Sequence, residues 1–125
     1  MKKKKKQLRR LSIEQLIEIT RNSSAERWRA IYAGRPKDGN RMFDLLVAID
    51  RELRARGLDA QRHLLSLLDD PDPGTRCWAA ASVLEFAPDD GERVLTELAK
   101  APNELIGFSA EMTLEQWRAG TFKPL

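Results

Sequence analysis

Residues 69–86 read DDPDPGTRCWAAASVLEF, and this stretch decides the fold class. Asp72 stands directly before Pro73, an order typical of a helix start, because aspartate caps the first turn and proline lacks an N–H that would be unpaired there. The small and apolar residues that follow have helical spacing: Ala79, Ala80, Val83 and Leu84. We therefore interpret the segment as the joint of a helical unit.

Helical spacing of apolar residues continues through most of the chain, and no stretch alternates as a half-buried strand would. Ser12 and Gln15 have the S-x-x-Q form of a capping box. The expected helices begin at Ser12 with an interruption at residues 22–24, span about 25–33 and about 38–56, and end with one over about 104–119. Between them, Gly57 is expected to end a helix in a left-handed conformation, Asp59 to cap the fourth, and Pro88 with Asp89 and Asp90 to start the sixth.

A shift of 30 residues superimposes the second half of the chain on itself. The matching pairs share residue type or character: Leu65 with Leu95, Leu68 with Leu98, Trp78 with Phe108, Ala80 with Ala110, and Leu84 with Leu114. A period of this size with two helices per unit is typical of an α-solenoid, in which each unit buries its face against its neighbours. The sequence predicts an all-α solenoid of about six to seven helices.

The order LLSLLDDPDPGTRCWAAASVLEF resembles the HEAT-like repeat that also occurs in bilin lyase proteins. Together with the later IGFSAEMTLEQW it resembles the bacterial domain-of-unknown-function family numbered 2019, over about residues 12–120. The sequence departs from the repeat at Thr75, where valine is usual, and at Ile106, which replaces the basic residue equivalent to Arg76. The resemblance implies a short HEAT-like α-α solenoid with a right-handed superhelical stack, and no assigned activity.

Positive charge is concentrated at the start of the chain. Residues 1–10 hold seven Lys and Arg, and residues 11–125 hold 15 against 19 Asp and Glu. Blocks of like charge are usually disordered, so we expect a basic disordered arm over 1–11, one HEAT-like domain over 12–120 and a tail over 121–125. The arm offers a contact for nucleic acid or an anionic surface through five lysines: Lys2, Lys3, Lys4, Lys5 and Lys6.

Candidate catalytic and metal-ligating residues are few. Asp69, Asp70 and Asp72 offer oxygens to a hard cation, but helix capping by Asp72 and an ion pair to Arg76 explain the cluster better. Cys77 and His63 are the only members of their kinds, and packing of the cysteine is favoured over a nucleophilic pair. We expect no cofactor, no metal and no enzymatic activity.

The candidate partner-binding residues lie on the second helices of the two matching repeats. They combine aromatic and acidic side chains and are Trp78, Ser82, Glu85, Phe108, Glu111 and Glu115. In a two-layer solenoid such helices line a concave face, although packing between repeats also accounts for both aromatic residues. Trp117 is expected in the core because it follows the buried stripe of the last helix.

Three function classes remain open. The favoured hypothesis is a non-catalytic protein-binding module, for example a bacterial immunity or adaptor protein that binds a toxin or effector. The alternatives are a nucleic-acid-binding HEAT-like protein that uses its basic arm, and an enzyme of unknown type. No apolar run reaches the roughly 20 residues that cross a bilayer, and Glu14 and Glu18 interrupt any secretory core, so we expect a cytoplasmic protein.

Overall fold

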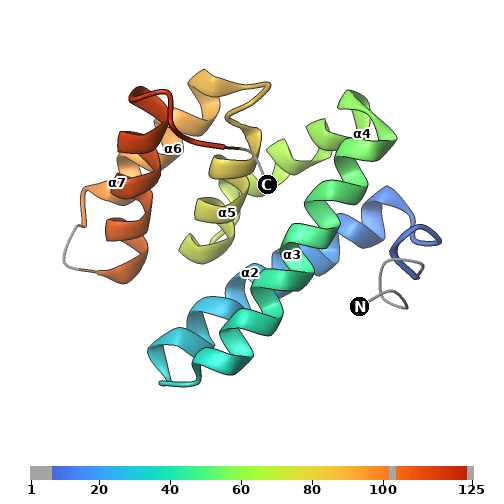
Figure 1. Cartoon of the computed structure of the whole chain (residues 1–125), viewed down its shortest axis with the longest axis horizontal. Helices are drawn as coiled ribbons and strands as arrows, with labels where there is room; N and C mark the ends of the chain where they lie inside the picture. The colour runs from blue at the N-terminus through green and yellow to red at the C-terminus, as the bar shows by residue number, and fades with distance from the viewer. Residues whose placement is uncertain (1–6, 102–103, 124–125) are drawn as a thin grey trace. The chain divides into compact units, whose positions relative to one another are not determined.

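The computed structural model describes residues 7–101 and 104–123, and it divides into two compact units, unit 1 (Met1–His63) and unit 2 (Leu64–Leu125). Within the described residues there are six α-helices, one 3-10 helix and no strand, which confirms the all-α prediction (Figure 1). The predicted single domain over 12–120 stays a prediction. The elements are α2 (Ile13–Tyr32), α3 (Pro36–Arg56), α4 (Leu58–Gln61), η1 (Arg62–Asp69), α5 (Pro73–Val83), α6 (Pro88–Ala99) and α7 (Leu105–Arg118).

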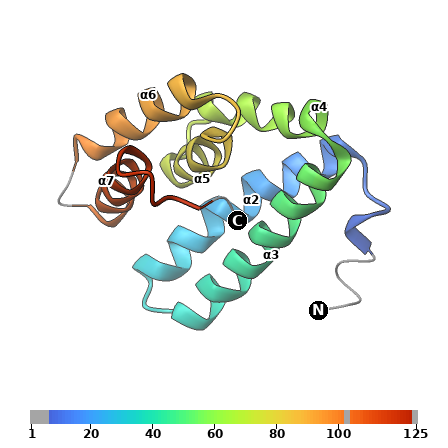
Figure 2. The ribbon, with the colours of Figure 1, turned by 45° about the horizontal axis from the view of Figure 1, so that its top comes forward.

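Unit 1 is a helical hairpin in which α2 and α3 lie side by side, as both ribbon views show (Figure 2). The predicted capping box at the start of α2 is confirmed. The Gln15 backbone N–H donates to Ser12 Oγ at 3.1 Å, and the Ser12 N–H donates to Gln15 Oε1 at 2.8 Å. The buried side chains of the two helices follow the helical period and include Leu16, Ile17, Trp28, Leu46, Ile49 and Leu53.

The predicted interruption at residues 22–24 is wrong, because α2 runs through it without a break. Ser24 Oγ donates to the Thr20 carbonyl oxygen at 2.6 Å, and Thr20 Oγ1 donates to the Leu16 carbonyl oxygen at 2.9 Å. Hydroxyls that bond one turn back along a helix are satisfied within it, so they can be buried there. Thr20, Ser23 and Ser24 are all buried, and their small size suits a packed face.

Residues 7–11, which the prediction placed in a basic disordered arm over 1–11, are folded onto unit 1. Leu8 is buried, and the guanidinium of Arg56 donates to the carbonyl oxygens of Leu8 at 2.9 Å and Arg9 at 3.3 Å. The same guanidinium also donates to Glu52 Oε2 at 2.8 Å, so α3 holds the segment in place. Lys2 to Lys6 lie outside the described residues.

Gly57 ends α3 with a φ of +107°, a backbone conformation that favours glycine, as the sequence predicted. The fourth helix differs from its prediction, because Gly57 rather than Asp59 precedes it and α4 has only four residues. The 3-10 helix η1 then continues to Asp69. With three residues per turn, Leu64 and Leu67 fall on one face, and both are buried.

Unit 2 contains α5, α6 and α7, with α6 packed against both of the others and α5 also touching α7 (Figure 1). Gly91 lets α6 approach α5 closely, because a Cβ there would lie 2.7 Å from the Ala80 carbonyl oxygen. Two residues near the end of the chain also pack together. Trp117 is half-buried and meets the ring of Phe122 edge-on, with centroids 6.3 Å apart. Part of the predicted tail over 121–125 is therefore folded back.

Candidate functional site

The loop before α5 caps the start of that helix, as predicted. Asp72 Oδ2 accepts a hydrogen bond from the Thr75 backbone N–H at 3.0 Å, and Pro73 occupies the first helical position. The predicted ion pair of Arg76 is replaced by main-chain contacts, since its guanidinium donates to the carbonyl oxygens of Asp70 at 2.7 Å and Pro71 at 3.0 Å. The described residues contain no group of three or more His, Cys, Asp or Glu that could hold a metal ion.

The other candidate for chemistry, Cys77 with His63, falls in two different units. Cys77 is buried in α5, whereas His63 is exposed and belongs to unit 1. A buried thiol behaves as a small packing group, in agreement with the preferred interpretation of the sequence. The absence of enzymatic activity stays a prediction.

The six candidate partner-binding residues divide by environment. Trp78 is buried, with 8% of its surface exposed, and Ser82 beside it is half-buried. The remaining four are exposed: Glu85, Phe108, Glu111 and Glu115. Trp78 therefore presents little surface to a partner, and the residues that offer contacts concentrate on α7.

Corresponding faces of α5 and α7 have opposite exposure. The 30-residue shift places Leu105 on Thr75 and Phe108 on Trp78. Thr75 is fully buried and Trp78 nearly so, whereas Leu105 is 48% exposed and Phe108 is 56% exposed. The face that is covered on α5 is therefore open on α7.

The open face carries a continuous apolar row, which we call the α7 stripe and define as Leu105, Phe108 and Met112. Their spacing of i, i+3 and i+7 places them on one side of the helix, opposite the buried Ile106, Ala110 and Leu114. Met112 is 41% exposed. Sequence reasoning missed Leu105 and Met112; the same shift aligns them with the polar Thr75 and Ser82, which was the one signal that they differ from core positions.

Acidic side chains border the α7 stripe along one edge. Glu104, Glu111 and Glu115 are spaced i, i+7 and i+11, so they follow one line along the helix beside Phe108, and all three are exposed. On the other edge the helical period places neutral polar residues, Ser109, Thr113 and Gln116. The surface thus combines three apolar contacts with a one-sided negative charge.

The sequence of the chain matches the family described as "Domain of unknown function (DUF2019)" over residues 14–119. The chain belongs to the DUF2019 family. The resemblance drawn from the D-x-P turn and its repeat is thus confirmed at the level of the family. The match spans α2 to α7, so it includes the α7 stripe and both units.

A solved structure shares the fold of this DUF2019 protein. The crystal structure of the protein RPA1889 from Rhodopseudomonas palustris CGA009 has a TM-score of 0.88 and 28% sequence identity, and the similarity covers 94% of this chain and 98% of that one. No curated protein matches the sequence. Of the helices that the structure describes, none has the length and apolar character required to span a membrane.

Proposed function

We propose that the protein is a binding module whose α7 stripe docks onto a basic, partly apolar helical segment of another protein. The observation that carries the proposal is the exposure of Leu105, Phe108 and Met112 on one side of α7. Single exposed apolar residues are ordinary, but a contiguous row on one helix is a feature of interaction sites. The proposal keeps Phe108, Glu111 and Glu115 from the predicted set and leaves out Trp78.

The repeat supports this interpretation. In a HEAT-like solenoid, an outer helix that faces only water carries a polar face, since an apolar one would promote aggregation. The α7 stripe has the opposite character, and its counterpart on α5 is covered. We infer that the α7 face is likewise suited to being covered, in this case by a partner.

Charge defines the chemistry of that partner. Unit 2 holds 5 Lys and Arg against 11 Asp and Glu, a net charge of −6, and three of the carboxylates border the stripe. Complementary charge fixes the orientation of a complex and speeds its formation. The partner segment therefore carries apolar residues at helical spacing with Lys or Arg along one edge, the pattern of an amphipathic helix bound in a groove or on a face. A toxin or effector with such a segment fits the immunity or adaptor role.

A designed pair of peptides tests the surface directly. The probe is a 14-residue Leu and Lys peptide with leucines at i, i+3, i+4 and i+7, and its control replaces every lysine with glutamate. Backbone amide NMR shifts of the full chain are followed as each peptide is added. We expect the basic peptide to shift α7 amides in a salt-sensitive manner and the acidic peptide to leave them unchanged.

Matched variants complete the experiment. Phe108→Ser with Met112→Ser should weaken binding of the basic peptide at least tenfold, whereas Leu58→Ser, which alters a comparably exposed apolar residue in unit 1, should not. Equal binding by all variants, or shifts confined to residues outside α7, would contradict the proposal. Concentration-dependent dimerisation that Phe108→Ser abolishes would identify a second copy as the occupant instead of a foreign partner.

A further inference from the structure

Unit 1 is strongly basic, in contrast to unit 2. Residues 1–63 hold 17 Lys and Arg against 8 Asp and Glu, a net charge of +9. Seven of these basic residues lie in the first ten positions, and residues 11–63 hold the other 10 against 8 Asp and Glu, a net charge of +2. Positive charge concentrated on one part of a protein is the electrostatic signature of a surface that binds polyanions.

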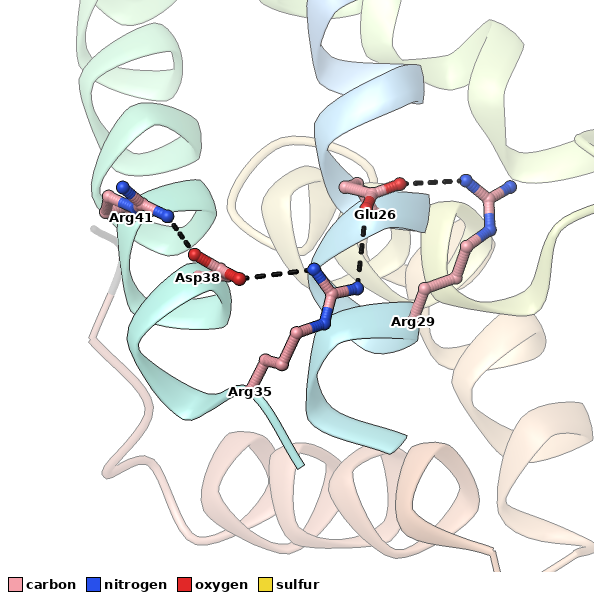
Figure 3. A network of polar contacts seen from close by, with 5 residues as sticks. All are labelled: Glu26, Arg29, Arg35, Asp38 and Arg41. Atoms are coloured by element: carbon pink, nitrogen blue, oxygen red, sulfur yellow. Dashed lines mark hydrogen bonds and ion pairs between the residues drawn. The ribbon is translucent and has the colours of Figure 1, made fainter. Parts of the chain in front are cut away.

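Three arginines gather where α2 turns into α3, and we call Arg29, Arg35 and Arg41 the arginine cluster. Figure 3 shows them joined in a row by two carboxylates. Arg29 donates to Glu26 at 3.1 Å, and Arg35 lies 4.0 Å from the same carboxylate and 3.2 Å from Asp38. Arg41 pairs with the other oxygen of Asp38.

The guanidiniums are the more exposed groups of this network. The side chains of the arginine cluster are between 52% and 70% exposed, whereas those of Glu26 and Asp38 are 46% and 32% exposed. Three positive groups share two negative ones, and Lys37, which precedes Asp38 in the sequence, is also exposed. Each guanidinium has five N–H donors, so the carboxylates hold it in place and leave donors for a further anion.

An exposed aromatic residue follows Arg29 along α2 at helical spacing. Tyr32 is three residues after Arg29 on α2 and is 54% exposed. Its ring contacts Trp28 with centroids 6.3 Å apart, and the Arg27 guanidinium lies 5.0 Å from the centroid of Trp28 and 5.1 Å from that of Phe43. The cation–π contacts of Arg27 link α2 to α3 and hold in place the Trp28 ring that Tyr32 contacts.

We propose that this end of the hairpin binds single-stranded nucleic acid, with the arginine cluster on phosphates and Tyr32 stacked on a base. Planar guanidiniums match the geometry of phosphate oxygens, and an aromatic ring among basic residues provides the stacking surface that unpaired bases use. A membrane surface fits less well. Insertion into a membrane needs several exposed apolar side chains. The described part of unit 1 has two large ones, Tyr32 and Leu58, and Leu58 follows the opposite end of α3.

The test is a fluorescence anisotropy titration of the full chain against a labelled 20-nucleotide oligo(dT) across a range of salt concentrations. Arg29→Gln, Arg35→Gln and Arg41→Gln are combined in one variant. The matched control removes three exposed basic residues of unit 2 and combines Arg93→Gln, Lys100→Gln and Arg118→Gln. Surface ion pairs contribute little to stability, so both variants should remain folded by circular dichroism.

Salt dependence distinguishes the outcomes. Loss of three phosphate contacts should weaken binding at least tenfold and reduce the slope of log K against log salt by about 2, because each contact on a single strand contributes roughly 0.7. The control should bind within about twofold of wild type. Tyr32→Ala should weaken binding about tenfold, while Tyr32→Phe keeps the ring and the affinity.

Two results would overturn the proposal. The first is unchanged affinity and slope in the cluster variant while replacement of Lys2 to Lys6 by glutamine removes binding, which would assign the contact to the lysine arm. The second is binding to phosphatidylserine vesicles that depends on the arginine cluster and exceeds binding to the oligonucleotide. Neither result bears on the α7 stripe, so this inference and the proposed function fail independently.

Discussion

Trp78 and Phe108 occupy corresponding positions in the 30-residue repeat, and truncating each to alanine should have very different effects. Trp78 is only 8% exposed, and loss of a buried tryptophan side chain costs about 3–5 kcal/mol in the free energy of unfolding. Phe108 is 56% exposed, so less than half of a full burial term of roughly 1.5–3 kcal/mol is lost. Alanine also has a helix propensity about 0.5 kcal/mol better than phenylalanine, which leaves a net cost of about 0.5 kcal/mol.

Urea unfolding followed by far-ultraviolet circular dichroism measures this difference without relying on tryptophan fluorescence. With a slope of about 2 kcal/mol per molar urea, Trp78→Ala should lower the midpoint by about 2 M and Phe108→Ala by about 0.3 M. Equal shifts would refute the reasoning, because they would mean that the two faces are covered to the same extent. A larger loss for Phe108→Ala would also remove the basis for the proposed docking surface.

Three further predictions concern single contacts. Asp72→Ala should lower the free energy of unfolding by about 1 kcal/mol through loss of a cap, while Asp72→Asn retains most of it by the same urea measurement. Gly91→Ala should lower the free energy of unfolding by about 1–2 kcal/mol, because its Cβ would lie 2.7 Å from a carbonyl oxygen of α5. Gly39→Ala is the control and should be neutral or stabilising, because the nearest atom to its Cβ is a side-chain atom at 3.3 Å. Arg56→Met should speed amide hydrogen exchange in residues 7–11 at least fivefold and leave α3 protected, and unchanged exchange there would show that the guanidinium does not hold the segment.

Local signals along the chain predicted most of the helices correctly. The capping box at Ser12, the Asp72 and Pro73 start of α5 and the glycine after α3 each describe a backbone requirement that is met within one or two turns. Such requirements depend on few neighbours, so a sequence displays them directly. The prediction of a break at residues 22–24 was wrong for a related reason. Serine favours helix ends only when its hydroxyl does not bond back along the helix, and the Ser24 hydroxyl does.

Exposure was harder to predict than helix position. The spacing placed Trp78 and Phe108 at the same point of two repeats, but spacing describes which residues share a face and not whether another element covers that face. Leu105 and Met112 were missed for the same reason, since an apolar residue on a helix is usually assigned to the core. Similarly, Leu8 belongs to a basic stretch whose composition is typical of disorder, and its burial and the hydrogen bond from Arg56 show that it is folded.

The net charge of the whole chain concealed a difference in charge between its two units, on which both proposals depend. Outside the first ten residues the chain is slightly acidic, and that value argues against a polyanion-binding body. Divided at residue 63, the same charges separate into a slightly basic part, with +2 over residues 11–63, and an acidic one, since unit 2 has a net charge of −6. Charges of opposite sign on separate units select different partners, because each attracts what the other repels. The α7 stripe and the arginine cluster should therefore serve two ligands, and a variant at one surface should leave binding at the other intact.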